Sequence, residues 1–180
     1  SLLRESLPIL VANYGERHPK VWFDQTNYGR LLQSKTDYAG AAEVFRTVLA
    51  GRLEVLGERH EMVPVSKNDL ALVLRAQGRF AESEKLQAET IAHFDTVAGP
   101  SHPLTLAARA SRGRVLCDLG RFAEAEAELR PSRDALAKIL GADHGRTLAT
   151  NWSLARAVAA RGDAREADAL YRTVVEAPAG

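Results

Sequence analysis

Four histidines recur at equal intervals along the 180-residue chain, at His18, His60, His102 and His144. Imidazole nitrogens bind zinc, so a regular set of histidines first suggests a metal site. Equivalent positions in successive structural repeats lie at least one interhelix distance apart, about 8–10 Å. Two ligands of one zinc ion lie within about 4 Å of each other, because each bond is about 2.1 Å long. The spacing therefore favours histidines that pack in loops, and we predict no shared metal site.

No pattern of residues in the sequence indicates a catalytic site. Cys117 is the single cysteine, and it falls late on a predicted helix, where a small apolar side chain fills space. No glycine-rich phosphate loop is present, since the segment 78–80 fits a helix turn. A run of alternating glutamates fits a solvated face, because no opposing carboxylates accompany it; its members are Glu124, Glu126 and Glu128. We therefore predict a protein that is not an enzyme and has no catalytic residue, bound metal or cofactor.

The composition sets limits on location and partners. The formal net charge is +1, so the chain as a whole gives no reason to expect nucleic acid or an acidic membrane surface. A single cysteine excludes an internal disulfide and fits a reducing compartment. No apolar run approaches the roughly 18 residues that a membrane span needs, and the start of the chain has no signal-peptide pattern. We expect a cytoplasmic protein that does not enter a membrane.

The histidines belong to a sequence repeat of constant length, which divides the chain into four copies. A glycine precedes each histidine by three residues, and a second marker, glycine or threonine, stands near the middle of each copy. Two residues after that marker comes an aromatic side chain in three of the copies, and three residues later a small one. The markers in chain order are Gly15, Gly57, Gly99 and Gly141; Thr36, Gly78, Gly120 and Gly162; Tyr38, Phe80, Phe122 and Ala164; Ala41, Ser83, Ala125 and Ala167.

Between the markers the apolar residues follow a helical period. From Lys20 to Lys35 they are spaced by three and four residues, which predicts a first helix in each repeat, helix A. A second helix, helix B, is predicted in the segments 39–56, 81–98, 123–140 and 165–177. Glycine tolerates the positive φ of a helix end, so the glycines before the histidines should terminate helices B. Ser101 and Asp143 are predicted to cap the helices that follow.

These elements predict an all-α fold without strands. One helix pair cannot bury both of its apolar faces, so the copies must stack into a right-handed solenoid of antiparallel helix pairs with a concave face. We expect nine helices in a single domain over residues 1–180, as a fragment of a longer array. Residues 1–14 are the second helix of a preceding repeat, followed by repeats 1 to 4 at 15–56, 57–98, 99–140 and 141–180, the last with a truncated second helix.

Three segments carry a resemblance to a known family: 102–106 (HPLTL), 120–126 (GRFAEAE) and 140–144 (LGADH). They resemble the tetratricopeptide repeats of kinesin light chains, which share this repeat length, and more closely the bacterial relatives of these repeats in arrays attached to kinases, NTPases or regulators. HEAT-like repeats have a similar length, but the turn of glycine, any residue and an aromatic, followed by a small residue, favours the tetratricopeptide repeat.

The resemblance implies a protein-binding scaffold whose helices A line the concave side. Kinesin light chains hold peptide backbone with asparagines midway along helix A, and the residues near that position here are Asn27 and Asn68. Trp152 falls in a column of equivalent positions that faces the groove in the tetratricopeptide layout; the others in it are Thr26, Asn68 and Ala110. Trp152 is therefore either an exposed binding anchor or a packed residue, whereas Trp22 belongs to an apolar column and is predicted to be core.

The sign of charge divides between the two kinds of helix. The four helices A carry eleven basic and three acidic side chains, a net charge of +8, and the helices B carry thirteen acidic and eight basic ones, a net charge of −5. Solvated faces explain charge but not this division. The concave side is therefore predicted to be basic and to bind an acidic peptide, with the candidate residues Arg30, Arg75, Arg114, Arg156, Trp152, Asn27 and Asn68.

Three functions remain open at this stage. The first is a groove for an extended, acidic protein or peptide segment. The second is a structural or autoregulatory array that spaces or inhibits the other domains of a larger kinase, NTPase or transcription regulator. Nucleic-acid binding is the least favoured, because the groove lacks interleaved aromatics and the chain is not basic overall.

Repeat 3 departs from the pattern in two apolar columns. Arg112 stands where the other copies have tyrosine or leucine, and Glu128 stands where they have valine or leucine. Burying either charge alone is costly, so we predict an Arg112–Glu128 pair between helices A and B. The alternative is that both side chains turn outward because Pro131 distorts helix B.

Overall fold

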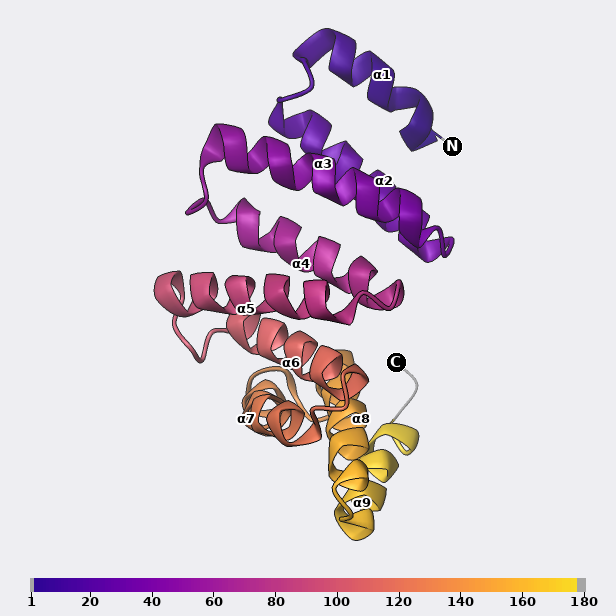
Figure 1. Cartoon of the computed structure of the whole chain (residues 1–180), viewed down its shortest axis with the longest axis vertical. Helices are drawn as coiled ribbons and strands as arrows, with labels where there is room; N and C mark the ends of the chain where they lie inside the picture. Colours follow the sequence, from indigo (N-terminus) through magenta and orange to yellow (C-terminus); the bar gives the residue numbers. More distant parts are fainter. Residues whose placement is uncertain (1, 178–180) are drawn as a thin grey trace. The chain divides into compact units, whose positions relative to one another are not determined.

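The computed structural model describes the backbone of residues 2–177 and the side chains of residues 6–177. Within residues 2–177 it contains nine α-helices and no strand, as the repeat predicts, and none of these helices exceeds 19 residues. The helices are α1 (Leu2–Tyr14), α2 (Pro19–Ser34), α3 (Tyr38–Leu56), α4 (Met62–Ala76), α5 (Phe80–Val97), α6 (Pro103–Asp118), α7 (Phe122–Leu140), α8 (Gly145–Ala160) and α9 (Ala164–Val175), joined by short turns (Figure 1). Helices A are α2, α4, α6 and α8. In the described part of the chain no helix is long and apolar enough to cross a membrane.

The chain forms two compact units, Ser1–Leu86 and Gln87–Gly180, with the division inside α5. In unit 1, α1 packs on α2, α2 on α3 and α3 on α4. In unit 2, α6 packs on α7, α7 on α8 and α8 on α9, and the two helices A, α6 and α8, also touch. Within each unit the predicted antiparallel helix pairs therefore stack in chain order, each helix B lying between its own helix A and the next.

Each unit has its own apolar core. The core of unit 1 joins α3 to α4 through Ala41, Ala42, Phe45, Leu49, Val63, Leu70, Val73 and Leu74. The core of unit 2 draws on α6 to α9 and includes Leu116, Cys117, Leu129, Leu154, Val158 and Leu170. Cys117 is buried and forms no disulfide, and its thiol donates to the Ser153 carbonyl at 3.6 Å. Its burial agrees with its predicted role as a filler. Trp22 is 3% exposed and is a core residue as predicted.

Glycines on helix A make room for large side chains on helix B of the same repeat. A Cβ atom added to Gly29 would lie 2.6 Å from the ring of Phe45, and one added to Gly113 would lie 2.5 Å from Cγ of Leu129. The helices therefore approach closely where a large residue on one faces no side chain on the other.

The helix ends follow the predicted glycine pattern. Gly57, Gly99 and Gly141 have positive φ angles of 78°, 88° and 100° at the ends of α3, α5 and α7, which confirms the prediction. Thr36 occupies the second marker position, where the other repeats have glycine, and it takes a φ of 62° despite its branched side chain. Such a conformation is unfavourable for a non-glycine residue.

Candidate functional site

The four repeat histidines bind backbone at the start of helix A. In each, Nδ1 accepts a hydrogen bond from the backbone N–H two residues later, with N–N distances of 3.1–3.3 Å. His18, His102 and His144 are the N-cap residues of α2, α6 and α8, so the prediction that Ser101 and Asp143 cap these helices is wrong. The first N–H groups of a helix lack partners within it, and the imidazole supplies one.

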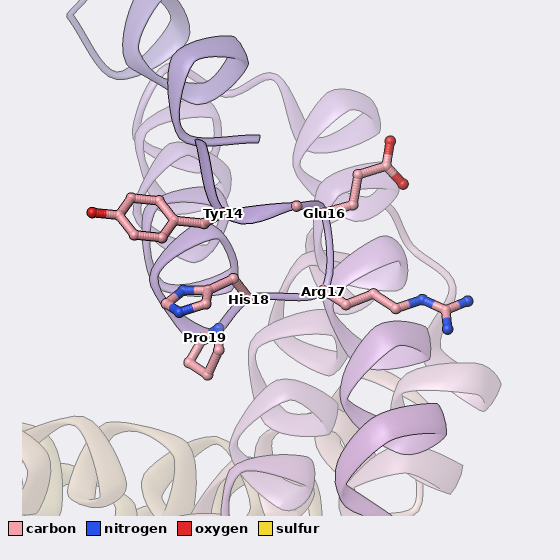
Figure 2. Close-up of a pocket in the computed structure, with 6 residues that line it drawn as sticks. Tyr14, Glu16, Arg17, His18 and Pro19 are labelled. Atoms are coloured by element: carbon pink, nitrogen blue, oxygen red, sulfur yellow. The ribbon is translucent and has the colours of Figure 1, made fainter. Parts of the chain in front are cut away.

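The first of these loops also forms a shallow hollow of about 510 Å³, lined by residues 14–19. Figure 2 shows the rings of Tyr14 and His18 on one side of the loop, while Glu16 and Arg17 point to the other. The two rings lie 4.8 Å apart between centroids, and the ammonium of Lys20 lies 4.8 Å from the Tyr14 ring. Because a single loop lines the hollow, its side chains are better explained as supports for the capping imidazole than as a binding site.

Substitution of His144 tests the capping role. His144→Ala should lower the free energy of unfolding by about 1 kcal/mol, because the N–H of Arg146 loses its acceptor. His144→Asn should retain most of the stability, since asparagine is a favourable N-cap residue. Urea unfolding of the two variants measures the difference, and equal stabilities for both would mean that the hydrogen bond contributes nothing.

Three arginines of the helices A in unit 2 pair with acids of the helices B: Arg109, Arg112 and Arg161. Glu128 on α7 accepts hydrogen bonds from Arg112 at 2.7 Å and from Arg109 at 3.3 Å, and Arg109 also reaches Asp95 on α5 at 2.6 Å. The predicted Arg112–Glu128 pair is thus confirmed, with a second arginine added to it. All four side chains are at most one-third exposed, so solvent screens these pairs only partly.

The alternative based on Pro131 is wrong. Helix α7 runs without interruption from Phe122 to Leu140, with Pro131 inside it and exposed to solvent. The outward rotation that a broken helix would have allowed does not occur, and Glu128 stays 15% exposed beneath its two arginines.

A second network in unit 2 joins α7, α9 and the end of α8. Arg130 donates to Glu126 at 2.6 Å and to Glu166 at 2.6 Å, and Arg161 also pairs with Glu126. The hydrogen bond from Arg130 lowers the pKa of Glu126, and Arg161 adds to this effect. Ion pairs between helices A and B therefore explain part of the division of charge between the two kinds of helix.

Two of the predicted groove arginines are held instead by acids of a neighbouring helix A. Arg30 on α2 donates to both carboxylate oxygens of Asp69 on α4, at 3.1 and 3.3 Å. Arg156 on α8 donates to Asp118 on α6 at 3.0 Å. Burial raises the pKa of Asp69, and Arg30 opposes that effect. The arginines remain 53% and 36% exposed, while their carboxylate partners are 11% and 13% exposed.

The other candidates lie at intermediate depth. Arg114 on α6 donates from its guanidinium to Ser111 Oγ at 2.8 Å, within its own helix. Arg75 lies in the last turn of α4, and Asn27 and Asn68 lie on α2 and α4; all three are half-buried. Unit 1 thus holds Arg30, Arg75, Asn27 and Asn68, and unit 2 holds Arg114, Arg156 and Trp152.

Two members of the column of Trp152 are buried. Thr26 is 7% exposed and Ala110 is 6% exposed, so the expectation that this column lines a groove is wrong for both of them. Trp152 itself is 49% exposed, and its ring meets Tyr171 of α9 edge to face, with 4.9 Å between centroids.

A sequence profile of the tetratricopeptide repeat matches residues 63–130 and 107–178, which together span more than half of the chain. The chain belongs to the tetratricopeptide repeat family. Such repeats are generally protein–protein interaction scaffolds and are typically non-catalytic, and the resemblance read from the repeat markers is confirmed.

Solved tetratricopeptide structures share the fold over nearly the whole chain. The TPR-like repeats of a Podosopora anserina protein titled a putative kinesin light chain match with 27% identity and a TM-score of 0.77, covering 97% of this chain and 83% of that one. A variant of the same protein gives 26% identity, a TM-score of 0.80, and coverage of 97% and 82%. BtubC (BKLC) from P. vanneervenii shares the fold at 18% identity, with a TM-score of 0.80 and coverage of 97% and 70%. No curated protein sequence matches the chain.

The acidic partners of Arg30 and Arg156 were not predicted from the sequence. Arg30 and Asp69 are 39 residues apart, and Asp118 and Arg156 are 38 residues apart. Both separations are shorter than one repeat by about one helical turn. Opposite charges at that spacing are therefore the signal of a contact between successive helices A. Arg52 was also missed: it is 5% exposed and donates to Ser66 at 2.6 Å, and its burial lowers its pKa.

Proposed function

We propose that this tetratricopeptide chain is a non-catalytic scaffold that binds an extended, acidic protein segment along its helices A. The proposed contacts are Arg30, Arg75, Asn27 and Asn68 in unit 1 and Arg114, Arg156 and Trp152 in unit 2. A bacterial, cytoplasmic setting is part of the same proposal, and Cys117, which forms no disulfide, suits a reducing compartment.

The observation that carries the proposal is how the arginines are distributed among partners. Arg109 and Arg112 are engaged by acids of the helices B, and neither side chain is more than 28% exposed. Arg30 and Arg156 instead pair within the layer of helices A and keep a third to a half of their side-chain surface exposed. A guanidinium has five N–H donors, so one carboxylate contact fixes its position and leaves donors for a ligand. Asp69 and Asp118 would thus orient the arginines that bind an acidic segment.

Binding of a labelled peptide tests the proposal. A short fluorescein-labelled peptide rich in glutamate, with one leucine, should bind the chain at low ionic strength and more weakly at about 0.15 M salt, where the Debye length is about 8 Å. Arg114→Gln combined with Arg156→Gln should weaken binding about tenfold, or about 1.4 kcal/mol. Glutamine is chosen because Arg156→Glu would place a second carboxylate beside Asp118. Fluorescence anisotropy gives both dissociation constants.

The matched control is Arg165→Gln combined with Arg172→Gln, which removes two exposed arginines of α9 in the same unit. It changes the charge of the chain in the same direction and should leave peptide binding unchanged. An equal loss in the control and in the Arg114/Arg156 variant would show that only net charge matters. Unchanged binding in the Arg114/Arg156 variant would exclude the arginines as contacts.

The second candidate function is a structural or autoregulatory array within a larger kinase, NTPase or transcription regulator. The ion pairs between helices A and B favour it, because they account for much of the charge without any ligand. This function predicts that the acidic peptide does not bind at either salt concentration.

A further inference from the structure

The last turn of α9 exposes a side chain whose equivalents are buried in two of the three earlier repeats. Val175 is 77% exposed, whereas Leu49 and Ile91, at equivalent positions of α3 and α5, are 9% and 7% exposed. The equivalent residue of α7 is Arg133, whose side chain is 30% exposed. Trp152 shows the same contrast with Thr26 and Ala110 in its own column. Val175 and Trp152 are therefore exposed at positions that are buried in two of the three preceding repeats.

These side chains form one apolar strip, which we call the α8–α9 face: Trp152, Tyr171 and Val175. The rings of Trp152 and Tyr171 are in contact, with their centroids 4.9 Å apart. Tyr171 and Val175 are four residues apart on α9, so they lie one above the other on the same side of the helix. Tyr171 is partly buried against the core of unit 2, so it holds the exposed ring of Trp152 beside the exposed Val175. Exposed apolar side chains gathered in this way are typical of a surface that binds a partner.

The rest of the chain indicates what covers this kind of face. In unit 1, helix α4 packs on α3, and Leu70, Val73 and Leu74 of α4 belong to the same buried cluster as Leu49. In unit 2, helix α8 packs on α7 in the same way. In both units, the helix that covers the equivalent face is a helix A whose buried side carries leucine, valine or alanine.

The charges on α9 fit the same occupant. Glu126 on α7 pairs with Arg161, which ends the helix that covers α7. Asp168 stands at the position of α9 equivalent to Glu126, and it is 64% exposed in a pair with Arg172. A helix lying on α9 in the register of α8 on α7 would bring a basic residue at its C-terminal end to Asp168.

We propose that the α8–α9 face binds an amphipathic α-helix of a partner, laid along α9 in the place that a helix A occupies on α3 and α7. The partner helix carries an apolar stripe of leucine, valine or alanine and a basic residue in its last turn. This site shares Trp152 with the proposed peptide contacts but includes none of the arginines, and the argument for it does not depend on them.

A peptide with the sequence of residues 60–78 serves as the probe. It contains α4 with its capping histidine, it is the helix that covers α3, and it has no tryptophan. Added to the full chain, it should bind saturably, shift the emission of Trp152 to shorter wavelength and protect it from acrylamide. The buried Trp22 contributes a constant background. The same peptide with Gln77→Arg should bind about threefold more tightly, because it supplies the charge opposite Asp168.

Variants of the chain give the decisive comparison. Val175→Asp should weaken peptide binding about tenfold or more, because docking would bury an unpaired carboxylate. Val97→Asp is the matched control, since Val97 is the last residue of α5 and is 62% exposed; it should leave binding unchanged.

Absence of binding, or binding that Val175→Asp does not affect, would overturn the proposal. A dimer of the chain with a protected Trp152 would also overturn it, since a second copy would then be the occupant. Retained binding in the Arg114/Arg156 glutamine variant would show that the two sites act separately.

Discussion

Replacing Glu128 by leucine is expected to lower the free energy of unfolding by about 3 kcal/mol. The carboxylate accepts hydrogen bonds from Arg109 and Arg112, and neither guanidinium is more than 28% exposed. Its removal takes an acceptor from both cations where solvent reaches them only partly, and hydrogen bonds to charged groups are the more costly ones to lose. Urea unfolding followed by circular dichroism measures the loss.

The companion variants separate the ion pair from packing. Arg112→Leu should cost less than Glu128→Leu, because Glu128 keeps Arg109. The double change Arg112→Leu with Glu128→Leu should be close to the original stability, because leucine is the residue at both positions in repeats 2 and 4. If Glu128→Leu costs as little as a surface substitution, the network does not support the fold.

Leu129→Ala is expected to cost about 3 kcal/mol, since the side chain is fully buried and its loss leaves a cavity. Gly113→Ala should cost about 1–2 kcal/mol, because the new Cβ would lie 2.5 Å from Leu129 Cγ and the better helix propensity offsets only part of the clash. The double variant should cost less than the sum of the two by at least about 1 kcal/mol, because the added methyl group enters the space that leucine leaves.

Leu136→Ala provides the control for this pair. Leu136 is as fully buried as Leu129 and lies on the same helix, about 10 Å further along. Combined with Gly113→Ala, it should give additive losses, as expected for sites that do not touch. Equal additivity in both combinations would mean that Gly113 and Leu129 are not coupled.

The sequence predicted the fold well because the repeat shows the same physical constraint several times. Glycine at a helix end, an aromatic two residues after a turn and a three–four apolar period recur in register from one repeat to the next, so chance agreement is excluded. The Arg112–Glu128 pair was predictable for the same reason: two charges replaced apolar residues in one repeat. Thr36, in contrast, breaks the glycine pattern and still adopts the positive φ, because the surrounding repeat determines the turn.

The candidate site was predicted less completely, because it depends on contacts between repeats. The charges summed over each kind of helix predicted the sign of its net charge but not the partner of each arginine. Asp69 and Asp118 were therefore counted as charges, and their ion pairs with Arg30 and Arg156 were not predicted. The histidines were assigned to loops without their capping role, although proline directly follows His18 and His102 at a position typical of the first turn of a helix.

The most direct test of the central claim is to observe the arginine side chains themselves while an acidic ligand is added. In an NMR titration with the glutamate-rich peptide, the Nε–H signals of Arg114 and Arg156 should shift together and saturate at the same peptide concentration. Those of Arg109 and Arg112 should stay in place, because acids of the helices B already engage them. Shifts confined to Arg165 and Arg172 on α9, with Arg114 and Arg156 unchanged, would contradict the account and place the acidic ligand on the helices B.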